Sequence, residues 1–156
     1  MSEVKVSVQV ARSIAEAFLE FTLGIDAWWP PAGRGGDAPQ VFIEPHVGGR
    51  WYERDANRIV CPWGRVLAWE PPRRVMLSWQ IGADGEFDAD LETLIEVNFV
   101  ALSASACRVS LHHRQLERYG AVAAAQQSML VSNVGWLGIL ESFSRCLDAA
   151  QPAQPA

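Results

Sequence analysis

The sequence predicts an α+β fold in which a curved antiparallel sheet of seven strands wraps around one long C-terminal helix, with two short helices after the first strand. Three observations predict this fold. The chain begins with an alternating apolar and polar segment, continues as strands divided by turns, and ends in a long segment with a helical apolar stripe. The terminal helix is the only predicted element large enough to cover the apolar face of such a sheet.

The first element is a strand over residues 4–10, where valine alternates with polar residues in the period-two pattern of a half-buried strand. A helix follows, because Ser13 and Glu16 have the spacing of a capping box, and Gly24 ends it. A second short helix is expected over residues 25–29, before a pair of prolines.

The middle of the chain is expected to form six further strands, preceded by a loop over residues 32–39. This loop contains three glycines and no periodicity, and we expect it to be the most mobile part of the chain. Turn-forming residues at 55–57 and 70–72 and a longer polar loop at 82–88 separate the strands. The six strands are predicted over residues 41–44, 49–54, 63–69, 74–80, 93–101 and 106–114.

The last element is predicted to be one continuous helix over residues 126–148, where apolar side chains recur at three-, four- and seven-residue spacings. At about 1.5 Å per residue it would be roughly 34 Å long. Gly135 would lie inside it, where glycine is unfavourable by about 1 kcal/mol relative to alanine. Its presence predicts a close approach of the helix to an aromatic side chain or to the sheet. Residues 1–150 are expected to form one domain, and residues 151–156 a disordered tail.

Composition and charge exclude several classes of protein. With 156 residues, 49% of them hydrophobic and 20% charged, the chain has an ordinary globular composition and can bury a core without disulfides. A formal charge of −5 argues against nucleic acid as a partner. The apolar stretches are too short for a membrane helix, and the N-terminus lacks a secretory pattern. We therefore expect a cytoplasmic protein with three reduced cysteines and no membrane association.

The unusual feature of the composition is seven tryptophans against two tyrosines. Tryptophan is large and seldom completely buried, so this number indicates aromatic walls around a cavity, or else a heavily aromatic core. Strand parity places Trp79 and His113 on the face that meets the helix. The predicted ligand-binding residues are Trp28, Trp29, Trp51, Trp63, Trp79, His113, Met129 and Trp136.

His113 has three interpretations, whereas its neighbour His112 points to the opposite face of the strand. It is a buried neutral histidine with hydrogen-bond partners, a ligand contact, or a general acid or base. The chain contains no nucleophile elbow and no assignable pair of catalytic carboxylates, so no catalytic residue is predicted. Parity also separates the potential metal ligands Glu44, His46, Glu53 and Asp55, and neither a metal nor another cofactor is expected.

Several segments resemble the START-like SRPBCC superfamily. These are residues 42–53, 63–74 and 78–79, followed by the Leu-His-His triplet at 111–113 and by residues 135–140. More narrowly, they are similar to the branch related to the C-terminal domain of the activator of the ninety-kilodalton heat-shock chaperone ATPase. The resemblance runs from about residue 4 to residue 147. It implies a helix-grip fold with a cavity between sheet and helix, a fold used by lipid binders, polyketide cyclases and co-chaperones.

Three functional hypotheses follow. The first is binding of a small hydrophobic or aromatic molecule in the cavity, without catalysis. The second is an interaction module that contacts a chaperone or a second copy of the chain. The third is a cyclase-type enzyme in which His113 shuttles a proton. A large closed cavity with His113 in its wall would favour the first and third, and a filled core with an exposed apolar patch would favour the second.

Overall fold

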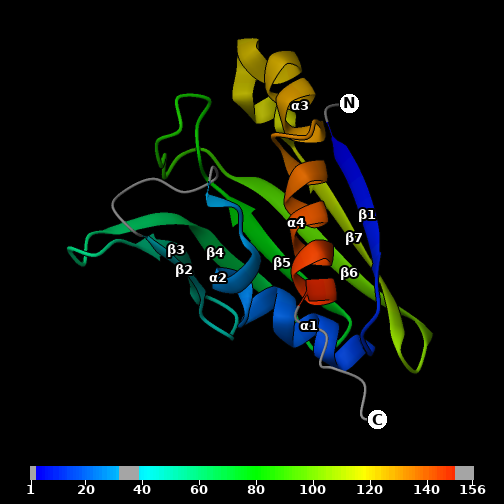
Figure 1. Ribbon diagram of the computed structural model, residues 1–156. Coiled ribbons are helices and arrows are strands. Elements are labelled where there is room, and N and C mark those ends of the chain that lie inside the picture. Colours follow the sequence, from blue (N-terminus) through cyan, green and yellow to red (C-terminus); the bar gives the residue numbers. More distant parts are fainter. Residues whose placement is uncertain (1–2, 32–38, 150–156) are drawn as a thin grey trace.

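In the computed structural model, which describes residues 3–31 and 39–149, the strands form one antiparallel sheet that curls around the last helix (Figure 1). Within these residues the sheet has seven strands in the order β1-β7-β6-β5-β4-β3-β2, so the first strand lies beside the last. The predicted α+β helix-grip fold is confirmed. Nearly all of the loop expected at residues 32–39 and the whole tail expected at 151–156 lie outside the described residues.

The order of the elements agrees with the sequence, and most boundaries differ by one to three residues. The chain forms β1 Val4–Val10, α1 Ile14–Thr22, α2 Ile25–Trp28, β2 Gln40–Ile43, β3 Arg50–Arg54, β4 Val60–Glu70, β5 Arg74–Trp79, β6 Thr93–Ser103 and β7 Ala106–Arg114. After the sheet come a short 3₁₀ segment, η2 Leu116–Val122, and the helices α3 Ala123–Val131 and α4 Trp136–Ala149. None of the helices in the described part of the chain is long and apolar enough to cross a bilayer.

The predicted cap of α1 is present. Ser13 Oγ accepts a hydrogen bond from the Glu16 backbone N–H at 3.2 Å and donates one to Glu16 Oε1 at 3.0 Å. The capped helix turns Phe18 and Phe21 towards the sheet, where their rings lie 5.1 and 5.6 Å from the ring centroid of Phe99 on β6. The cap therefore fixes the helix that closes one end of the core.

The expectation of one continuous helix over residues 126–148 is wrong. The helix breaks at residues 132–135, where Ser132 has an extended backbone and its hydroxyl donates to the Met129 carbonyl at 2.6 Å. Gly135 lies in this turn, outside any helix interior. A Cβ atom there would sit 2.3 Å from the Leu130 oxygen and 2.4 Å from the Met129 oxygen. The backbone oxygens at the end of α3 therefore require glycine at position 135. The expected close approach to an aromatic side chain or to the sheet is not the reason. At 14 residues, α4 is about 21 Å long.

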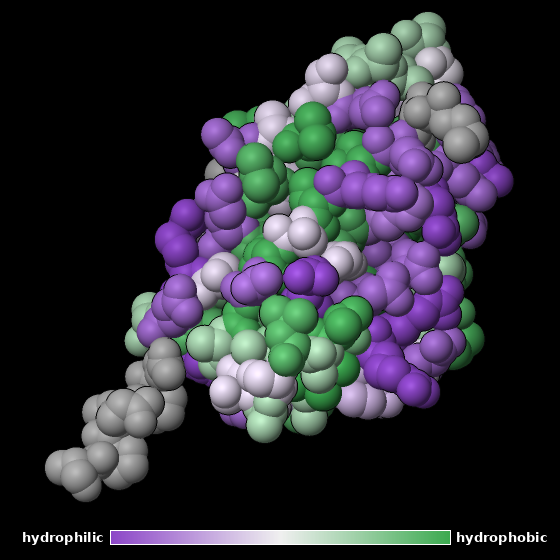
Figure 2. Space-filling model, turned by 90° about the vertical axis from the view of Figure 1, so that its right-hand side faces the viewer, coloured by the Kyte–Doolittle hydropathy of each residue, from purple (hydrophilic) through white to green (hydrophobic). Residues whose placement is uncertain are grey.

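The core lies between the concave face of the sheet and α4. The helix buries Trp136, Leu140, Phe143 and Leu147, at spacings of four, three and four residues. The strand parity predicted from the sequence is confirmed for β6 and β7, whose inward residues are buried, and for Val75 and Leu77 on β5, where Trp79 is half-buried. Viewed from the β1 edge, hydrophilic side chains cover the outer face of the sheet, and hydrophobic ones gather towards the helices (Figure 2). The interior between the concave face of the sheet and α4 holds the candidate site.

Candidate functional site

Five tryptophan rings from five different parts of the chain meet where α2, the sheet and α4 converge. Adjacent rings have centroid distances of 4.9 Å (Trp29 to Trp63), 5.4 Å (Trp51 to Trp79) and 5.5 Å (Trp79 to Trp136). Most pairs are edge-on or tilted, which is the arrangement that the charge distribution of aromatic rings favours. We call Trp29, Trp51, Trp63, Trp79 and Trp136 the tryptophan cluster.

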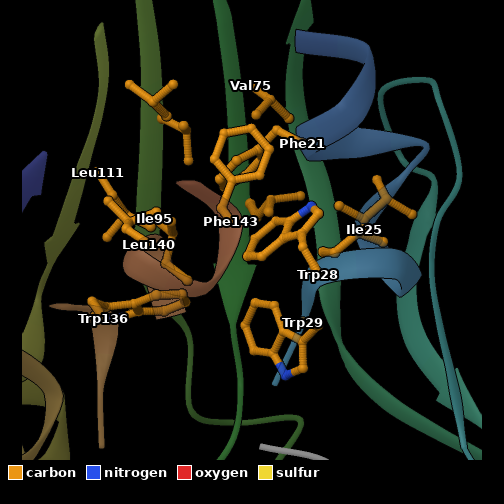
Figure 3. Packing of buried hydrophobic residues seen from close by; sticks show 14 of the residues in the cluster. Phe21, Ile25, Trp28, Trp29, Val75, Ile95, Leu111, Trp136, Leu140 and Phe143 are labelled. Carbon is orange, nitrogen blue, oxygen red and sulfur yellow. The ribbon is translucent and has the colours of Figure 1, made fainter. Parts of the chain in front are cut away.

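A small internal cavity adjoins the cluster. Trp136 on α4 lies across from Trp29, which follows α2, with their ring centroids 5.9 Å apart (Figure 3). The cavity has a volume of about 10 Å³, which leaves room for a single water molecule. The indole rings therefore fill most of the space between sheet and helix. The cavity is lined by Phe21, Ile25, Trp29, Trp51, Leu77, Ile95, Val97, Leu111 and Trp136.

His113 lies beside the cluster but is not among the residues that line the cavity. It is completely buried on β7, where the Trp136 indole N–H donates to His113 Nδ1 at 2.9 Å. Because an indole nitrogen can only donate, the proton of the neutral imidazole is on Nε2. His113 Nε2 then donates to Thr93 Oγ1 at 2.7 Å, and the Thr93 hydroxyl donates to the Trp79 carbonyl at 2.8 Å.

This hydrogen-bonded chain determines the chemistry of His113. Burial lowers the pKa of His113 to about 3, with a smaller contribution from the charge of His112. The ring is therefore neutral near pH 7, and both of its nitrogens have partners. Its burial, its two partners and its lowered pKa agree with the interpretation as a buried neutral histidine, and a contact with a ligand stays a prediction. His113 joins α4 to β5 and β6 through Trp136 and Thr93.

In contrast to His113, two tryptophans of the cluster have indole N–H groups without a hydrogen-bond partner in the described residues. Trp51 Nε1 and Trp79 Nε1 are buried and make no hydrogen bond within the described residues. Trp79 Nε1 lies beside the Tyr119 hydroxyl but without the geometry of a hydrogen bond, and the hydroxyl donates its own proton to the Ile81 carbonyl at 2.7 Å. A buried donor without an acceptor costs about 1–3 kcal/mol. The unpaired N–H of Trp51, which lies in the cavity wall, therefore lowers the stability of the folded protein.

Tyr119 separates the core from an open cleft of about 570 Å³ between the β5–β6 loop and η2. Its hydrogen bond to Ile81 and a 2.8 Å bond from Arg118 to the Glu92 carbonyl hold η2 against that loop. Burial raises the pKa of the Tyr119 hydroxyl, so it stays protonated near pH 7. Sequence reasoning missed Tyr119, because its segment has no periodic pattern.

The structure brings together most, but not all, of the predicted site residues. Trp28 is buried in the adjoining core, between Phe21 and Phe143, and its N–H donates to the Glu20 carbonyl. Met129 is 39% exposed on α3 and is not among the residues lining the cavity. Its role as a ligand contact stays a prediction.

The residues considered as metal ligands have other roles. Glu44 accepts hydrogen bonds from the Arg50 guanidinium at 3.2 and 3.3 Å, and these bonds hold the pKa of the Glu44 carboxyl below its usual value. Glu53 is buried on β3. In residues 3–31 and 39–149, no three His, Cys, Asp or Glu side chains are arranged to hold a metal ion.

The curled sheet around α4 defines a helix-grip protein of the SRPBCC type. The chain belongs to the family described as activator of Hsp90 ATPase homolog 1-like protein, whose model matches residues 24–148. This match confirms the resemblance seen in the sequence. A search of curated proteins found no match.

Several solved structures are similar over nearly the whole chain. One is titled "An anthrahydroquino-Gama-pyrone synthase Txn09 complexed with SUM", with 33% identity, coverage of 94% of this chain and 97% of that chain, and a TM-score of 0.64. Another is a self-sacrificing resistance protein, CalC from Micromonospora echinospora, with 29% identity, coverage of 96% and 97%, and a TM-score of 0.70. A protein from Mycobacterium smegmatis with 14% identity, covering 99% of this chain and 93% of its own, has a TM-score of 0.64 and shows the shared fold.

Proposed function

We propose that this protein binds a small aromatic molecule between the sheet and α4, held by the tryptophan cluster. The observation that carries the proposal is the buried Trp51 N–H, a hydrogen-bond donor without an acceptor in a wall that is otherwise apolar. Binding pockets are mostly apolar, with few polar groups that orient the ligand. The 33% identical synthase supports the same chemistry, because it is named for a fused aromatic ring system, an anthrahydroquino-γ-pyrone, and its structure is a complex.

Binding requires the cluster to open, because the cavity is far smaller than an aromatic ring system. The segment from Gln115 to Gly135 is suited to this movement. Gln115 and Gly120 have positive φ angles of 66° and 67°, and α3 ends in the turn at Gly135. Within that segment α3 buries only Leu130. We expect η2 and α3 to move when the ligand enters. This movement would carry Tyr119 away from the cluster and let the ligand pass.

The proposal includes no proton transfer by His113. A general acid or base needs a pKa near the working pH and a nitrogen free to reach the substrate. His113 has a pKa of about 3, and its two nitrogens contact Trp136 and Thr93. Its contribution is to fix the orientation of the Trp136 ring, which forms part of the cavity wall.

Action on a chaperone partner is the second candidate function. The filled core favours it, together with exposed apolar side chains near the α3–α4 turn, at Val131, Val134 and Leu137. The ATPase rate of purified Hsp90, measured with and without this protein, separates this candidate from ligand binding.

Titration calorimetry with fluorenone tests ligand binding. We expect a dissociation constant in the micromolar range for the wild type and, at 100 times that constant, stabilisation by about 2.7 kcal/mol. Val97→Leu places an extra methylene in the cavity wall and should weaken binding at least about tenfold. The matched control is Val100→Leu, because Val100 is half exposed on the same strand, and it should bind as the wild type does. Absence of both heat and stabilisation in the wild type would rule out the proposal.

A further inference from the structure

We infer that the tryptophan cluster selects aromatic ligands that carry a hydrogen-bond acceptor, such as the carbonyl of a ketone or quinone, over ligands of the same shape that carry a hydroxyl or no polar group. This inference rests on the proposed function and specifies the ligand class. It follows from which hydrogen-bonding groups in and around the cavity are free and which have partners.

The cavity wall offers one free donor. Six of the lining residues have purely hydrocarbon side chains, and the other three are Trp29, Trp51 and Trp136. An indole can only donate a hydrogen bond. The Trp136 N–H is donated to His113, and the Trp29 N–H is not among the buried donors that lack a partner. Trp51 therefore supplies the N–H that remains without an acceptor in the described residues.

The side chains that line the cavity offer no acceptor to a ligand, because they are hydrocarbon groups and indoles, and neither His113 nor Thr93 is among them. His113 Nδ1 already accepts from Trp136, and its Nε2 carries a proton. Thr93 Oγ1 accepts from His113 and uses its own proton on the Trp79 carbonyl. A ligand hydroxyl in this place could accept from Trp51, but its own proton would have no partner among the side chains that line the cavity.

A ligand carbonyl fits this set of groups, because it accepts a hydrogen bond and has no proton that needs an acceptor. On binding, the carbonyl would give up a hydrogen bond from water and accept one from the Trp51 N–H. This bond would also remove the free-energy cost of leaving that donor unpaired. A second unpaired indole N–H, on Trp79, lies on the adjacent ring, with a centroid distance of 5.4 Å from Trp51. Two donors on neighbouring rings suit a ring system with two carbonyls, such as a quinone.

Fluorene, fluorenol and fluorenone test the inference, because they share one ring system and differ only at one carbon. We expect calorimetry to show that fluorenone binds the wild type most tightly, and the decisive quantity is the ratio of the fluorene to the fluorenone dissociation constant. Trp51→Phe removes the N–H and should lower this ratio about fivefold. Trp69→Phe is the matched control. Trp69 packs against Phe18 and does not line the cavity, so its variant should keep the wild-type ratio.

The infrared carbonyl band of fluorenone bound to the wild type gives a second readout that does not depend on a variant folding. We expect this band at lower frequency than in cyclohexane, because a hydrogen bond weakens the C=O bond. An unchanged ratio in Trp51→Phe, or a bound carbonyl band at the cyclohexane frequency, overturns the inference while the proposed function stands. If none of the three compounds binds the wild type, the proposed function fails and the inference fails with it.

Discussion

Burial sets the protonation state of His113, and its neighbours set the tautomer. The imidazole lies where a positive charge would lose its hydration, so the neutral form is favoured. Trp136 can only donate, and this places the proton on the nitrogen that faces Thr93. Strand parity in the sequence was enough to place His113 inside. Its partners could not be predicted, because they depend on the register that sets Ile95 opposite His113 and on where α4 begins.

The lowered pKa of His113 predicts how stability depends on pH. The unfolded chain has an ordinary histidine pKa near 6.5, so between about pH 3 and 6.5 it binds more protons than the folded protein. The free energy of unfolding is therefore highest above about pH 6.5 and falls as the pH is lowered through this range. From about pH 7 to about pH 5 the loss from this residue should be roughly 2 kcal/mol, measured from urea midpoints.

His113→Gln should be less stable than the wild type near pH 7 but should lose much less stability over the same pH range, because the titrating group is gone. His46→Gln is the matched control, because His46 is exposed, and it should keep the wild-type pH dependence. Parallel pH profiles for the wild type and His113→Gln would contradict the buried neutral histidine.

The break between α3 and α4 shows where helical periodicity misleads. The apolar spacing of Met129, Trp136, Leu140 and Phe143 continues across the turn, so the pattern alone predicts one helix. The sequence from Ser132 to Gly135 nevertheless contains serine, asparagine and glycine, which are turn-forming residues. The physical reason for the break is local, since the Leu130 and Met129 carbonyls occupy the space that a side chain at Gly135 would need.

Gly135→Ala tests this explanation of the break. The added methyl group would meet backbone oxygens at 2.3 and 2.4 Å, so the turn must shift, and the free energy of unfolding should fall by about 1–3 kcal/mol. Val134→Ala, at a position in the same turn that is 80% exposed, should change it by no more than about 0.5 kcal/mol. Denaturant midpoints of both variants provide the measurement. A variant Gly135→Ala as stable as the wild type would show that the turn has room for a side chain.

At the scale of the whole molecule, the sequence predicted the sheet, its curvature around a terminal helix and the inward face of most strands. It did not predict how full the interior would be. Seven tryptophans are compatible with an aromatic wall and with an aromatic core, and composition alone cannot separate the two. The difference depends on how five rings, from the residue after α2, from three strands and from α4, pack against one another. In the structure they leave about 10 Å³ beside the cluster.

A tryptophan cluster that opens for a ligand has a direct signature in solution. The indole N–H groups give separate resonances in a proton–nitrogen NMR correlation spectrum, and substitutions to phenylalanine assign them. On addition of fluorenone, we expect the resonances of Trp51, Trp29 and Trp136 to shift most, because these rings line the cavity, while that of Trp69 stays in place. If the indole resonances stay in place and the largest backbone shifts fall on the exposed turn at Val134, the ligand binds outside and the interior is a core rather than a binding site.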